Sequence, residues 1–130
     1  MALENVVLIP ALVYGGIVAL IEIMFVHSDE AGMGWFKHAV HAAPLAIIFV
    51  FVNMNIQFVL DTFNLALPFN EIFLYAGVAL ISLIKIQAAA AIAGKTVGEK
   101  FVHTLIIALL IFASPYVYEY LWGMMPSYLQ

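Results

Sequence analysis

Four ionisable residues in this sequence lie inside long apolar runs and not in the polar segments between them: Glu22, His41, Lys85 and His103. Each belongs to a different run. At a helical rise of about 1.5 Å per residue from the polar connections, all four come to a similar depth. A charge within an apolar segment is costly and is usually paired or functional. The sequence therefore predicts one polar layer to which each of four segments contributes a single ionisable side chain.

Three kinds of chemistry could use this layer. If Glu22 pairs with Lys85, the two histidines are free to exchange protons near neutrality, and the layer handles protons or small cations. A second hypothesis makes His41 and His103 the axial ligands of a haem, or joins Glu22 to them as a site for a divalent metal. In the third, Glu22 and Lys85 form a purely structural ion pair. A lysine beside a metal adds positive charge, so the sequence favours proton or ion handling.

A second polar set follows the apolar run at residues 47–52. Asn53, Gln57 and Asp61 are spaced i, i+4 and i+8, which places them on one stripe of a helix. Asn55 points elsewhere. An amide without a partner in hydrocarbon costs several kcal/mol, so the stripe should face another helix, another protomer or water. The stripe is predicted to lie at the outer end of the bundle as an outer vestibule, and interhelical hydrogen bonds are favoured over an ion path as the use of these amides.

Composition explains why these polar residues stand out. The 130 residues are 66% hydrophobic and 9% charged, with a mean hydropathy of +1.11, whereas soluble domains carry about 25% charged residues. About 20 apolar residues span a bilayer as a helix, and the chain has four such windows, at 6–26, 36–60, 72–93 and 101–121. We therefore expect residues 1–130 to form one all-α domain, an integral membrane bundle of four transmembrane helices with short loops.

Pro44 falls within the second predicted span and Pro115 within the fourth. Each removes one backbone hydrogen bond from its helix. In a membrane, the carbonyl freed in this way needs a neighbouring donor. We expect a bend near each proline, with a neighbouring partner for the freed carbonyl, and favour the interpretation that both prolines are simply tolerated kinks.

The lysines predict an orientation. Lys37 flanks the first connection, and Lys95 and Lys100 flank the third. Cytoplasmic loops carry the excess of positive charge, so these two connections are expected in the cytoplasm and both termini on the non-cytoplasmic side.

Other classes of function receive little support. Arginine is absent and only four lysines are present, which argues against a nucleic-acid surface. No cysteine is present, so thiolate metal sites and disulfides are excluded. No nucleophile with a base partner and no phosphate-binding glycine loop can be found, so an enzyme is not indicated.

The preferred interpretation is a small transport or channel protein in a lipid bilayer. Its polar layers would bracket an apolar constriction that includes Ile47, Phe51, Leu80 and Leu109. The alternatives are a haem- or metal-binding subunit of a membrane redox complex and a structural subunit of a larger membrane assembly. Small residues suited to close helix contact, such as Gly15, fit a compact bundle and equally a homo-oligomer.

Overall fold

The computed structural model describes residues 6–29, 34–93 and 100–124, without the side chains of His38, His41 and residues 89–93. Every regular element in this part of the chain is an α-helix: α1 (Leu8–Asp29), α2 (Trp35–Met54), α3 (Ile56–Thr62), α4 (Glu71–Ala93) and α5 (Phe101–Trp122). All except α3 are long and apolar enough to cross a membrane. The prediction of an all-α bundle with four spans is confirmed.

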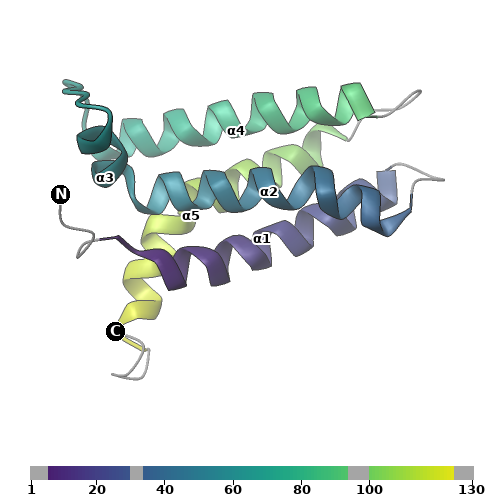
Figure 1. The fold of residues 1–130 in the computed structure, drawn as a ribbon, viewed down its shortest axis with the longest axis horizontal. Coiled ribbons are helices and arrows are strands. Elements are labelled where there is room, and N and C mark those ends of the chain that lie inside the picture. The colour runs from purple at the N-terminus through teal and green to yellow at the C-terminus, as the bar shows by residue number, and fades with distance from the viewer. Residues whose placement is uncertain (1–5, 30–33, 94–99, 125–130) are drawn as a thin grey trace.

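Each of the four long helices runs in the opposite direction to the long helix before it in the chain (Figure 1). Helix α2 packs chiefly against α1 and also contacts α4 and α5, while α5 contacts α1, α2 and α4. Helices α1 and α4 therefore lie diagonally across the bundle, with α2 and α5 between them. This placement decides which of the predicted polar residues can meet.

The core of the bundle is apolar and tightly packed. Its fully buried members come from three helices: Val18, Ala46, Val50, Ile107 and Ile111. The outer faces are apolar too, as expected for surfaces that meet lipid instead of water.

Two residues predicted to form a constriction lie outside this core. Leu80 is 59% exposed and Leu109 is 57% exposed, because both line a shallow groove between α4 and α5. Ile47 and Phe51 are partly buried. The apolar centre of the bundle is therefore formed by the core residues named above and not by the four residues predicted to form a constriction.

A close approach of two backbones fixes the register of α1 against α2. A Cβ atom added at Gly15 would lie 3.2 Å from the Cα atom of Ile47, so only glycine fits there without a shift. The helices are antiparallel, so residues seven positions further along α1 lie level with residues seven positions earlier on α2. Glu22 thus lies at the same height along the bundle as Val40, and the backbone of His41 lies one residue from that height.

The second predicted span, 36–60, is not one helix. It breaks at Asn55, between α2 and α3. The Asn55 side chain accepts the backbone N–H of Val7 at 2.7 Å and donates to the carbonyls of Val7 at 3.2 Å and Phe51 at 2.9 Å. Asparagine side chains compete with helical backbone hydrogen bonds in this way, and here the competition joins the end of α2 to the residues that lead into α1.

Candidate functional site

Ionisable side chains come together where α1 ends and α5 begins. The Nδ1 atom of His103 lies 2.6 Å from a carboxylate oxygen of Asp29, and the Lys100 ammonium lies 3.1 Å from the other oxygen. The backbone N–H of Lys100 also donates to Asp29, at 2.9 Å. The Asp29 side chain is 0% exposed and that of His103 is 20% exposed. We call these three residues the Asp29 cluster.

An aromatic ring holds the histidine of this cluster in place. Phe25, one helical turn before Asp29, stacks on the imidazole with ring centroids 4.2 Å apart and planes 9° apart. Because a carboxylate only accepts hydrogen bonds, the Nδ1 atom that faces Asp29 must carry a hydrogen. The stack and the hydrogen bond together fix the orientation of the His103 ring.

A second buried carboxylate, deeper in the bundle, belongs to Glu22. It is 1% exposed and precedes Asp29 by seven residues, which places both on one face of α1. Their levels differ by two helical turns, about 10 Å. Val18 and Val26, one turn to either side of Glu22, are also buried. Glu22 therefore lies deep within the apolar bundle on the face of α1 that leads to the Asp29 cluster.

The structure does not gather the four residues of the predicted layer. Lys85 is exposed on α4, which lies diagonally opposite α1, so among the described side chains it forms no ion pair with Glu22. His103 lies at the end of the bundle with Asp29. His41 lies on α2 near the level of Glu22, but its side chain is outside the described part of the chain.

The haem and metal hypotheses depend on His41 and therefore stay predictions. No group of three or more His, Asp or Glu side chains suited to a metal ion occurs among the described residues.

The predicted outer stripe is divided by the break at Asn55. Asn53 is 0% exposed and points into the bundle. Gln57 and Asp61 lie on α3 and are exposed. Gln57 donates to Glu71 at 3.2 Å. The three residues do not line one vestibule, because the helix that would align them is interrupted.

The Asn53 side chain forms a hydrogen bond at the proline bend of α5. Pro115 has no N–H to donate to the carbonyl of Ile111, and that carbonyl instead accepts Nδ2 of Asn53 at 2.6 Å and the hydroxyl of Ser114 at 2.7 Å. The part of α5 that follows bends away from the first part (Figure 1). The predicted need for a polar partner near Pro115 is confirmed, and Asn53 meets it from another helix.

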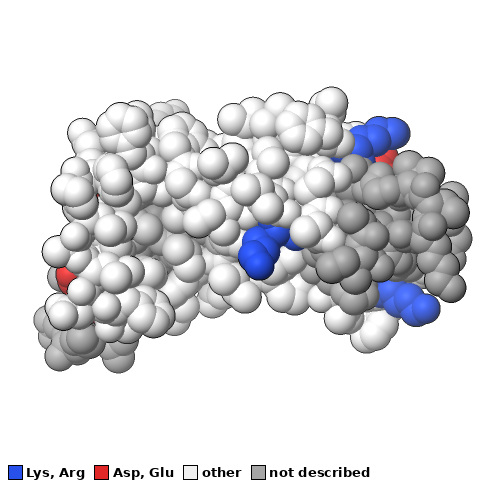
Figure 2. All heavy atoms as spheres, turned by 90° about the horizontal axis from the view of Figure 1, so that it is seen from above, with Lys and Arg blue, Asp and Glu red and all other residues white. Residues whose placement is uncertain are grey.

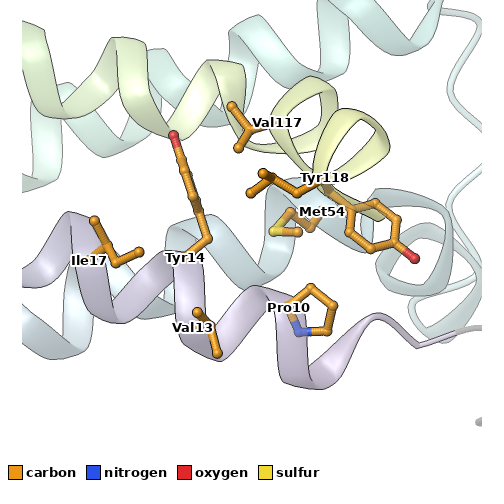
Figure 3. A pocket seen from close by; sticks show the side chains of 8 residues that line it. Pro10, Val13, Tyr14, Ile17, Met54, Val117 and Tyr118 are labelled. Atoms are coloured by element: carbon orange, nitrogen blue, oxygen red, sulfur yellow. The ribbon is translucent and has the colours of Figure 1, made fainter. Parts of the chain in front are cut away.

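The bend leaves a small apolar cavity of about 50 Å³ between α1 and the last turns of α5. Pro10, Tyr14, Met54, Val117 and Tyr118 are among its lining residues (Figure 3). The Tyr14 hydroxyl reaches across to α5 and donates to the carbonyl of Leu110 at 3.0 Å. The residues that line this cavity carry no charged group.

Charge is distributed unequally along the bundle (Figure 2). By the bounds of their helices, Lys37 and Lys100 lie at the end that holds the Asp29 cluster, and Asp61, Glu71 and Glu119 lie toward the opposite end. The position of the lysines at one end of the bundle is the feature from which both termini are predicted on the non-cytoplasmic side. The side of the membrane that each end occupies stays a prediction.

The fold and the site define the class of protein: four apolar helices fit a small multi-pass membrane protein with ionisable residues inside the bundle. Comparison with protein-family models, curated proteins and solved structures gives no match.

Proposed function

We propose that this chain is a small transport-type membrane protein that handles protons, with Glu22 as the buried group that takes up and releases the proton. The observation that carries the proposal is the burial of this carboxylate, 1% exposed within a membrane span. Ionisable residues inside membrane helices commonly mark proton relays and ion pathways. The Glu22 carboxylate lies on the same face of α1 as Asp29. This face of the helix leads from Glu22 to the end of the bundle.

The Asp29 cluster is the proposed entrance. The His103 ring is partly exposed and lies in contact with Asp29, and its two ring nitrogens can donate and accept hydrogen bonds. About 10 Å separates the level of Asp29 from that of Glu22, so a relay needs a group between them. Thr104 follows His103, is 0% exposed, and its hydroxyl has no hydrogen-bond partner among the described residues. Thr104 and His41, a member of the predicted layer, are the residues we assign to this step.

The packed core favours protons over larger cations. Val18, Val50, Ile107 and Ile111 fill the space between the level of Glu22 and the proline bend. A hydrated cation needs a continuous polar lining, whereas a proton passes between individual hydrogen-bonding groups. The same core would limit leakage, so we propose uptake at the lysine-bearing end followed by a gated step.

Infrared spectroscopy tests the role of Glu22. Difference spectra of the protein in lipid, taken between acidic and alkaline buffer, should contain a protonated-carboxyl band that Glu22→Gln removes. Glu119→Gln is the matched control, because Glu119 is exposed near the end of α5, and it should leave that band in place. A spectrum that is the same in wild type and Glu22→Gln would contradict the proposal.

A structural subunit is the second candidate function. It is favoured by the two buried amides, because Asn53 and Asn55 bond backbone groups of other segments and so fix packing. A structural subunit would show no Glu22-dependent band and no proton flux. The redox alternative would be recognised by a Soret band in the absorption spectrum of the purified protein. Assembly into a homo-oligomer or a larger membrane complex stays a proposal under each of these functions.

A further inference from the structure

Lys85 lies on the outer surface of a membrane span. It is exposed, and its neighbours Ile81 and Ile84 are 53% and 56% exposed apolar side chains. Lys85 is the lysine of α4. Its charge therefore faces the surroundings of the bundle and not its interior.

With α4 spanning the bilayer, the position of Lys85 along the helix would place it well within the hydrocarbon. It is 14 residues after Glu71 and 8 residues before Ala93, or about 21 Å and 12 Å from the two ends of the helix at 1.5 Å per residue. The hydrocarbon core is about 30 Å thick, close to the length of this helix. An ammonium at this depth is costly unless a counter-charge accompanies it.

Snorkelling to the nearer surface is geometrically unfavourable. Side chains on a helix leave the backbone toward its N-terminus, and the N-terminus of α4 is the Glu71 end, the more distant one. The stem of Lys85 thus begins by carrying the ammonium toward the middle of the membrane. Lipid phosphates at the Ala93 end are correspondingly hard to reach.

No described carboxylate of this chain can serve as the counter-charge. Glu22 is buried on the diagonal helix, and Asp29 is bonded to Lys100 and His103. Asp61, Glu71 and Glu119 lie in or beside helix ends at the other end of the bundle. A second copy related by a two-fold axis along the membrane normal would bring Lys85 to the depth of its own equivalent, and like charges repel.

We propose that the face of α4 formed by Ile81, Lys85 and Ala88 binds a transmembrane helix of a different chain, and that this helix carries an aspartate or glutamate at the depth of Lys85. The pair would neutralise both charges inside the hydrocarbon. The small exposed side chain of Ala88 permits the close backbone approach on which helix contacts in membranes depend. This interface is independent of the proton-handling role of Glu22.

A designed helix provides the test. The probe is a leucine-alanine transmembrane peptide with one glutamate about 12 Å from its basic end, compared with the same peptide carrying glutamine. Energy transfer to the full chain is measured in phosphatidylcholine vesicles, with the dye on a cysteine added at the C-terminus, since the chain has none of its own. Wild type should bind the glutamate peptide roughly five- to thirtyfold more tightly than the glutamine peptide.

Three lysine variants show whether the preference for glutamate arises at Lys85. Lys85→Leu should abolish the preference, Lys85→Arg should retain it, and Lys37→Leu, in the first turns of α2, should leave it unchanged. Lys85→Leu removes a charge from a lipid-facing position, so it should fold. The proposal is overturned if the two peptides bind equally to wild type, or if Lys85→Leu keeps the preference. It is also overturned if Lys85 instead recruits phosphatidylglycerol and gives no preference between peptides.

Discussion

Asn53→Leu combined with Ser114→Ala is expected to lower the free energy of unfolding by about 2–3 kcal/mol, well above the sum of the two single changes. In the structure, the Ile111 carbonyl accepts both the Asn53 amide and the Ser114 hydroxyl. Each single change leaves one donor and should cost roughly 0.6 kcal/mol, the average for such bonds in membrane bundles. The double change leaves none, because Pro115 has no N–H to give.

The proline supplies the control for this prediction. In a Pro115→Ala background, residue 115 regains the N–H that a helix directs to Ile111, so the same double change should cost much less. Equilibrium unfolding in mixed micelles, followed by circular dichroism, measures both backgrounds. Equal losses with and without Pro115 would show that the Asn53 and Ser114 side chains do not act through this carbonyl.

Asp29→Ala is expected to lower the free energy of unfolding by about 1–3 kcal/mol. The Asp29 carboxylate bonds the His103 ring, the Lys100 ammonium and the Lys100 backbone N–H. Lys100 is the N-cap residue of α5, and a negative charge at the N-terminus of a helix is stabilising. Loss of Asp29 therefore detaches the start of α5 from the end of α1.

Lys100→Ala is the matched comparison. The Lys100 side chain is 65% exposed, and exposed ion pairs contribute about 0–1 kcal/mol, so this change should have a small effect. Asp29→Asn should be intermediate, because the amide oxygen still accepts the Lys100 N–H. Hydrogen exchange of the first turn of α5 should increase most in Asp29→Ala. A Lys100→Ala variant as unstable as Asp29→Ala would contradict this account of the cluster.

The number of spans could be predicted from the sequence, because four apolar runs of membrane length leave no other arrangement. The break at Asn55 could not. Asn55 comes two residues after Asn53, which is equally polar but stays inside the helix, and the partner of Asn55 is the backbone of Val7, 48 residues away. A tertiary hydrogen bond of this kind leaves no local pattern in the sequence.

The depth of each polar residue could be counted along its helix, but the direction in which it faces could not. Depth alone assigns Glu22 and Lys85 to one layer, whereas the structure buries the first and exposes the second. Their helices are apolar on all sides, so hydrophobic periodicity gives little guidance about the inward face. Asp29 belongs to a polar connection by its sequence neighbours, although its spacing of seven residues from Glu22 is the signal that places the two carboxylates on one face.

Proton flux into liposomes tests the central claim most directly. With the protein reconstituted and a pH-sensitive dye enclosed, a potassium diffusion potential should drive proton uptake by wild type and by Glu119→Gln. Glu22→Gln, correctly folded by circular dichroism, should reduce the rate by about tenfold or more. Uptake by Glu22→Gln at the wild-type rate would contradict the assignment of Glu22 as the proton-carrying group.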